Sequence, residues 1–136
     1  MTVAANADSK VSSILMVEDE EHLRQLTAAV LERAGFNVLQ AGDASEASEI
    51  WQRDQASINV LLADILVPGK TGAELAVEFR KTQPMLKVIF ISGSDRKTLV
   101  ETSQMVRGAK FLRKPYSAGH LIDLVRTELA AQAVGR

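Results

Sequence analysis

Residues 60–72 read Val-Leu-Leu-Ala-Asp-Ile-Leu-Val-Pro-Gly-Lys-Thr-Gly, a short apolar run that ends at Asp64 and continues into a loop. No polar residue interrupts the run before Asp64, which is typical of a parallel strand buried on both faces. Similar apolar runs occupy residues 14–17 and 88–91, and they end at Glu18 and Ser92. These three runs predict the central strands of a sheet that helices cover on both sides.

The segments between the strands carry apolar residues at helical spacing. Two weaker strands are predicted at residues 36–41 and 110–112. Five helices are also predicted: three at 23–34, about 73–81 and about 96–107, one that begins at residue 44 and one that begins after residue 117. Asp43 and Glu46 are typical of a capping box at the second helix, and Ser117 can cap the last. Strict alternation predicts an α/β, doubly wound parallel sheet. Right-handed crossovers leave few strand orders, of which 2-1-3-4-5 is one.

Composition excludes several classes of function. Lys and Arg number 16 and Asp and Glu 17, so the net charge of −1 gives no reason to expect nucleic-acid or membrane binding. The chain has no cysteine, which excludes disulfides and thiolate zinc sites. No apolar run approaches the roughly 20 residues needed to cross a bilayer. We therefore expect a cytoplasmic protein with a flexible leader at 1–12, one domain at 13–132 and no output domain.

Chemically active side chains follow four of the predicted strands. Glu18 and Asp19 follow the first strand, Asp64 the third, Ser92 the fourth and Lys114 the fifth. Ligands of open parallel sheets bind at this carboxyl edge. Three neighbouring carboxylates repel one another, and Mg²⁺ is the cation that suits them. With an ammonium and a hydroxyl nearby, the set predicts a cradle for a transferring phosphoryl group, with Asp64 as nucleophile.

Four segments, in order and at the proper spacing, carry a family resemblance: Ile14–Glu20, Leu61–Gly72, Val88–Gly93 and Gly108–Pro115. Through them the chain resembles the receiver domain of two-component response regulators over roughly residues 13–131. The resemblance implies a flavodoxin-like (βα)5 three-layer sandwich with parallel strand order 2-1-3-4-5.

The resemblance also implies a role for each acidic residue. Asp64 would be the phosphoacceptor and would take its phosphoryl group from the phosphohistidine of a histidine kinase. Asp19, Asp64 and the backbone carbonyl of Leu66 would bind Mg²⁺ directly, and Glu18 would bind it through a water molecule. Glu18 stands where aspartate is commoner in the family, and its longer side chain alters this water-mediated contact.

The remaining site residues would bind the phosphoryl group and respond to it. Ser92 and Lys114 would each contact a phosphoryl oxygen, and the Lys114–Pro115 peptide bond would be cis. Phe111 stands at the family's aromatic switch position, where it lacks the hydroxyl of the commoner tyrosine. Ser92 and Phe111 would move together and reshape the face formed by the fourth helix, fifth strand and fifth helix. Leu66 and Ser94 lie where the family tunes the lifetime of the aspartyl phosphate.

Several functional hypotheses stay open. The resemblance implies a histidine kinase as phosphoryl donor, and a place in a phosphorelay in which the chain passes the group to a histidine phosphotransfer protein. It also implies a downstream protein target and a homodimer that forms on phosphorylation. It implies no enzyme activity beyond autocatalytic phosphorylation and dephosphorylation. Both a stand-alone regulator and the C-terminal receiver of a hybrid kinase fit. The alternatives are a degenerate receiver that acts as an unphosphorylated scaffold and a haloacid-dehalogenase-like phosphohydrolase. The phosphohydrolase needs a second acid where Leu66 stands. A flavodoxin is excluded because four acidic residues, 18–21, would repel a flavin phosphate.

Overall fold

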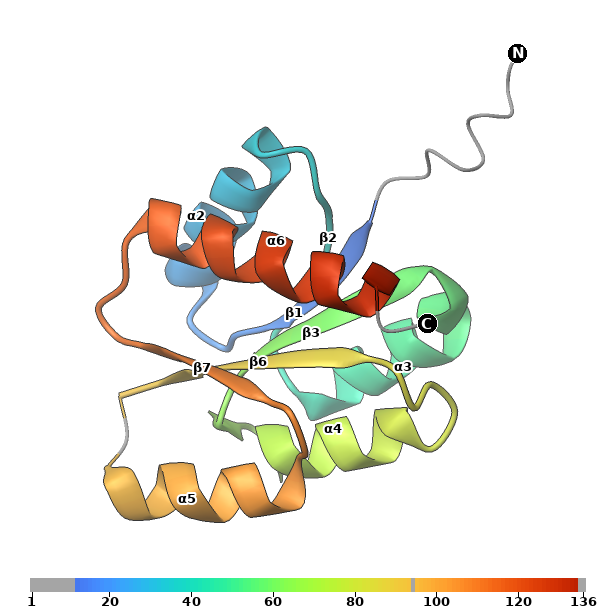
Figure 1. The fold of residues 1–136 in the computed structure, drawn as a ribbon, viewed down its shortest axis with the longest axis vertical. Coiled ribbons are helices and arrows are strands. Elements are labelled where there is room, and N and C mark those ends of the chain that lie inside the picture. The colour runs from blue at the N-terminus through green and yellow to red at the C-terminus, as the bar shows by residue number, and fades with distance from the viewer. Residues whose placement is uncertain (1–11, 94, 135–136) are drawn as a thin grey trace.

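The computed structural model describes residues 12–93 and 95–134 and has three layers (Figure 1). The middle layer is a five-stranded parallel sheet in the order β2-β1-β3-β6-β7. Its strands are β1 (Ser13–Val17), β2 (Asn37–Ala41), β3 (Ile58–Asp64), β6 (Lys87–Ser92) and β7 (Lys110–Arg113). Taken in chain order, this is the predicted 2-1-3-4-5 arrangement, so the predicted α/β sandwich is confirmed.

Helices form the two outer layers. On one face of the sheet lie α2 (Glu21–Arg33) and α6 (Ala118–Val134) (Figure 1). On the other face lie α3 (Ala44–Asp54), α4 (Gly72–Arg80) and α5 (Arg96–Met105), with a short 3-10 turn, η1 (Gln55–Ser57), after α3. No helix in residues 12–93 and 95–134 has both the length and the apolar character needed to cross a membrane.

Two hydrophobic cores explain why the central strands are continuously apolar. Along β1, Leu15 and Val17 enter the core beneath α3 and α4, whereas Ile14 and Met16 enter the core beneath α2 and α6. Successive side chains of a strand point to opposite faces, so a sheet covered on both sides needs apolar residues at every position. The first core also contains a stacked aromatic pair, Trp51 of α3 and Phe79 of α4, with ring centroids 4.4 Å apart.

The loop expected at residues 68–72 is more ordered than its composition indicates. It contains a small antiparallel hairpin of β4 (Leu66–Val67) and β5 (Lys70–Thr71), with Gly69 at a φ of +100° in the turn. Helix α4 then begins one residue earlier than expected, because Thr71 and Glu74 form a reciprocal capping box. This hairpin returns the chain to the sheet edge directly after Asp64.

The predicted capping box at α3 is only half formed. The Asp43 side chain accepts a hydrogen bond from the Glu46 amide at 2.8 Å. The Glu46 side chain, however, accepts from the Gly42 amide at 2.6 Å, one residue before the position that a capping box requires. The cap predicted at α6 is confirmed, because the Ser117 hydroxyl accepts from the His120 amide at 3.0 Å. The leader residues 1–11 and Ser94 lie outside the described residues.

Candidate functional site

The register of the parallel sheet brings the predicted site residues together. Val17 lies beside Ala63 across β1 and β3, and Asp64 lies beside Ile91 across β3 and β6. Ser92, the last residue of β6, pairs with Arg113 of β7. The residues that follow these positions therefore meet at one edge of the sheet. The prediction that the carboxyl ends of these strands converge is confirmed.

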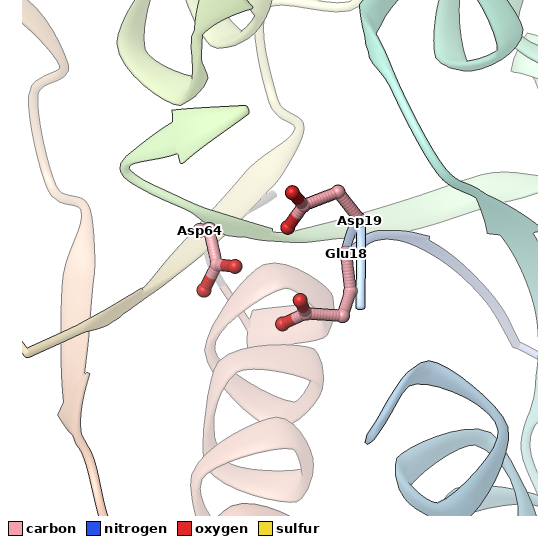
Figure 2. Close-up of side chains that lie close together, drawn as sticks. All are labelled: Glu18, Asp19 and Asp64. Carbon is pink, nitrogen blue, oxygen red and sulfur yellow. The ribbon is translucent and has the colours of Figure 1, made fainter. Parts of the chain in front are cut away.

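Three carboxylates form the centre of this edge. One carboxylate oxygen from each of Glu18, Asp19 and Asp64 lies within 4.8 Å of the other two. The three side chains face a common space from the ends of two neighbouring strands (Figure 2). Glu18 and Asp64 are only 4% and 8% exposed, whereas Asp19 is exposed. The cluster thus has a buried side and an open side.

Burial and crowding change the acidity of Asp64. Loss of hydration and the neighbouring Glu18 carboxyl together raise the pKa of Asp64 from 3.8 to about 7, against the opposite effect of the Lys114 ammonium. The protein therefore holds a carboxylate whose negative charge lacks full compensation. A cation at this position would provide that compensation.

The Asp64 oxygen nearest to Lys114 lacks a hydrogen-bond donor among the described residues. The Lys114 Nζ atom lies 3.4 Å from Asp64 Oδ1, which is an ion-pair distance. The buried Oδ1 has no hydrogen-bond partner among the described residues. An unsatisfied buried oxygen within a set of carboxylate oxygens fits Mg²⁺, which prefers hard oxygen ligands. The residues present therefore fit a divalent cation.

A small cavity of about 270 Å³ lies beside Asp64, and Lys114, Ser92 and Leu66 are among the residues that line it. The Leu66 side chain is 68% exposed at its mouth. The Ser92 carbonyl accepts a hydrogen bond from the Lys114 amide at 2.9 Å, which ties β6 to the segment after β7. The Lys114–Pro115 peptide bond is cis, as the resemblance implied.

Phe111 is half-buried on β7 and packs against the core beneath α3 and α4. Its ring is tilted against that of Phe90, with centroids 5.8 Å apart. Phe90 in turn lies next to Gly72, where an added Cβ would stand 3.0 Å from the Phe90 ring. Phe111 thus contacts Phe90, which packs next to the start of α4 and the end of β3.

Arg24 belongs to the site although the sequence analysis did not select it. Its Nη1 atom donates a hydrogen bond to the Glu18 carbonyl at 2.8 Å. The Glu18 amide donates to the Ala41 carbonyl at 3.0 Å, and the Glu18 side chain accepts from the Glu20 amide at 2.9 Å. A single arginine within an amphipathic helix carries no local signal of such a contact, which only the packing of α2 against β1 reveals.

The structure also contains a larger apolar groove next to the site. It has a volume of about 600 Å³, lies between α2 and the segment 114–121, and shares Lys114 with the cavity beside Asp64. Leu26 is 63% exposed in its wall. The hydroxyl groups of Thr27 and Tyr116 lie 3.2 Å apart and join the two sides. No local sequence pattern predicts this groove, because Thr27 and Tyr116 on its two sides are 89 residues apart in the chain.

A parallel five-stranded α/β sandwich with carboxylates at the carboxyl edge of its sheet is the arrangement of a CheY-like signalling module. The chain belongs to the response regulator receiver domain family of two-component signalling, whose sequence model matches residues 14–126. This finding confirms the family that the four sequence segments indicated.

Individual relatives agree with this assignment. The chain is 38% identical to the response regulator receiver protein CpdR of Brucella abortus, over 82% of this chain and 89% of CpdR. It is 31% identical to the sensor kinase CckA of the same organism, over 89% of this chain but only 13% of the kinase. It also spans 51% of the sensory transduction protein RegX3 of Mycolicibacterium smegmatis, at 30% identity. The chain therefore matches one part of several longer proteins.

Solved structures show the same fold. A CheY-like receiver domain protein from Methanospirillum hungatei has a TM-score of 0.85 at 25% identity, covering 93% of this chain and all of that one. The receiver domain of the hybrid histidine kinase CckA has a TM-score of 0.74 at 32% identity, covering 87% and 99%. The likeness thus extends to a CheY-like receiver domain protein and to the receiver domain of a hybrid histidine kinase.

Proposed function

We propose that residues 13–132 act as a phosphoacceptor receiver, in which Asp64 takes a phosphoryl group from a phosphohistidine. The observation that carries the proposal is the environment of Asp64. This carboxylate is buried, lies between two other carboxylates and an ammonium, and has an oxygen with no hydrogen-bond partner among the described residues. A structural ion pair has no need of such an arrangement, whereas a nucleophile that receives a charged group does.

In the proposed reaction, an Asp64 carboxylate oxygen forms a bond to phosphorus while the phosphorus–nitrogen bond of the phosphohistidine breaks. The imidazole leaves with the electron pair of that bond and takes a proton from solvent. Lys114, at 3.4 Å from Asp64, and Ser92 line the space that the phosphoryl oxygens would enter. Fixed donors of this kind stabilise the charge on the transferring group. The domain modifies itself in this reaction and is not an enzyme for a separate substrate.

Mg²⁺ is the proposed cofactor. Asp19, Asp64 and the Leu66 carbonyl would hold it directly, and Glu18 would hold it through water. When bound, the ion supplies positive charge that offsets the carboxylates and the incoming phosphoryl oxygens. Glu18 contributes negative charge on the buried side of the site. Asp19 lies on the exposed side, from which a phosphoryl donor would approach.

The proposed donor is a protein, either a histidine kinase or a histidine phosphotransfer protein in the cytoplasm. The apolar groove beside α2 supports this choice, because it shares Lys114 with the acceptor cavity and exposes Leu26. An exposed apolar surface that adjoins an active site is typical of a protein contact. We expect the donor to cover this groove while its phosphohistidine reaches Asp64.

The proposed output is a change in the surface formed by α5, β7 and α6. Phosphorylation would draw Ser92 toward the phosphoryl group and change the packing of the half-buried Phe111. A downstream protein, or a second copy of the chain, would recognise the changed surface. This mechanism converts a local charge into a packing change.

Intact-mass measurement tests the proposal directly. The wild type is incubated with acetyl phosphate or with a phosphorylated histidine phosphotransfer protein, with Mg²⁺ or with EDTA. We expect one added phosphoryl group that requires Mg²⁺ and is absent in Asp64→Asn. Asp123→Asn is the matched control, because Asp123 is exposed on α6. A wild type that stays unmodified by both donors contradicts the proposal and favours an unphosphorylated scaffold.

A further inference from the structure

We propose that Arg24 is a positioning residue for the acid pair Glu18–Asp19, and that it acts through the peptide bond between them. The inference rests on the proposed Mg²⁺ site and adds a residue that does not itself bind the ion. Its basis is the hydrogen bond of 2.8 Å from Arg24 Nη1 to the Glu18 carbonyl.

This hydrogen bond acts on Asp19 because a peptide group is planar. The Glu18 carbonyl and the Asp19 amide belong to the same rigid plane, so a group that holds the carbonyl also fixes the direction in which Asp19 leaves β1. The donor is a charged guanidinium, and hydrogen bonds from charged donors are stronger than those between neutral groups. Arg24 therefore opposes rotation of this plane.

Asp19 depends on this support more than Glu18 does. Glu18 is also held by its amide, which donates to the Ala41 carbonyl, and by its carboxylate, which accepts from the Glu20 amide. The Asp19 carboxylate is exposed and receives no hydrogen bond from any residue of 12–93 and 95–134. The backbone thus sets the position from which the Asp19 side chain starts, and Arg24 is a side chain that holds this backbone through the Glu18 carbonyl.

The turn after β2 leaves room for the arginine. A Cβ atom at Gly42 would stand 3.1 Å from Arg24 Nη1 and 3.3 Å from Glu46 Oε1. The Gly42 amide donates to the same Glu46 oxygen at 2.6 Å. The guanidinium therefore sits between the end of β1 and the turn after β2, where a glycine permits the close approach.

Charge and positioning predict opposite effects when Arg24 is replaced. The guanidinium is a positive charge next to the proposed cation site, so its removal would strengthen Mg²⁺ binding if charge alone mattered. Loss of the hydrogen bond to Glu18 would instead let the Asp19 carboxylate move and would weaken Mg²⁺ binding. Loss of a group that orients a metal ligand typically weakens metal binding by about 10–100-fold. For Arg24, removal of its positive charge offsets part of that loss of Mg²⁺ affinity.

The test is a Mg²⁺ titration of the full chain followed by amide shifts in ¹H–¹⁵N spectra, without a phosphodonor. We expect Arg24→Met to raise the Mg²⁺ dissociation constant by about 3- to 10-fold. Arg24→Lys should recover part of the loss, because an ammonium can donate to the same carbonyl. Arg33→Met is the control, because Arg33 is exposed at the end of the same helix and carries the same charge. Arg24→Met that binds Mg²⁺ as tightly as the wild type, or more tightly, overturns the proposal.

A second measurement does not depend on the metal. In EDTA, the Asp19 amide of Arg24→Met should broaden relative to the wild type, while Arg33→Met leaves it unchanged. Arg24→Gln, which is too short to reach the carbonyl, replaces Arg24→Met if the latter does not fold, and the same outcomes apply. A wild type that does not bind Mg²⁺ contradicts the proposed function. If the wild type binds Mg²⁺ and an Arg24 variant binds it equally well, the role proposed for Arg24 is contradicted but the proposed function is not.

Discussion

The substitution Asp64→Asn should stabilise the protein in the absence of Mg²⁺, and the gain should increase with pH. Burial and the Glu18 carboxyl together raise the pKa of Asp64 to about 7, because their effect exceeds the opposite effect of the Lys114 ammonium. Between the unfolded value of 3.8 and about 7, the folded state holds a proton that the unfolded state releases. The stability contributed by this proton is present below about pH 4 and is lost as the pH rises through about 7.

The size of the effect follows from the difference between these two pKa values. At about 1.4 kcal/mol per pH unit, a shift from 3.8 to about 7 corresponds to at most about 4 kcal/mol above pH 7. Asparagine has nearly the same shape and no charge, so it removes the cost of burying the carboxylate. We expect at least about 2 kcal/mol of this gain at pH 8 and about 1 kcal/mol at pH 5.

Urea unfolding followed by far-UV circular dichroism, in EDTA at pH 5, 6, 7 and 8, measures this gain. Asp123→Asn, at an exposed position of α6, should show a small difference that does not change with pH. Saturating Mg²⁺ should stabilise the wild type more than Asp64→Asn, because the ion binds the charged cluster of the folded state. A stability difference between wild type and Asp64→Asn that is independent of pH, or a less stable Asp64→Asn at pH 8, would refute the reasoning.

Two further substitutions test other parts of the structure. Leu26→Glu places a charge in the apolar groove and should slow phosphoryl transfer from a protein donor by about tenfold or more, with a smaller effect on acetyl phosphate. Equal effects on both donors, measured by intact mass over time, would speak against the groove as the docking surface. Trp51→Ala removes the ring stacked on Phe79 and should cost about 3–5 kcal/mol in urea unfolding. A loss below about 1 kcal/mol would contradict the role of this pair in the core.

Sequence reasoning succeeded where a signal is local and periodic. Continuous apolar runs identified β1, β3 and β6, because a strand covered on both faces must be apolar at every position. Capping signals were less reliable: the box expected at Asp43 is incomplete, whereas Thr71 and Glu74 form a complete one. The difference arises because the Glu46 side chain can accept from the Asp43 amide or from the Gly42 amide. The structure has the bond to Gly42, and the sequence does not show which of the two forms.

The sequence by itself determined the order of strands and helices, and which side chains follow each strand. In a parallel sheet, every strand runs in the same direction, so residues after successive strands must share one edge. That rule places Glu18, Asp19 and Asp64 on one edge, and the pairing of β1 with β3 in the structure brings their carboxylates together.

Tertiary structure alone decided the properties that depend on distance and burial. The raised pKa of Asp64 requires loss of hydration, and the groove requires Thr27 to meet Tyr116 from 89 residues away. The contact of Arg24 with the Glu18 carbonyl likewise depends on how α2 packs on the sheet. Hydration and packing are sums over neighbours from the whole chain, and no short stretch of sequence contains them.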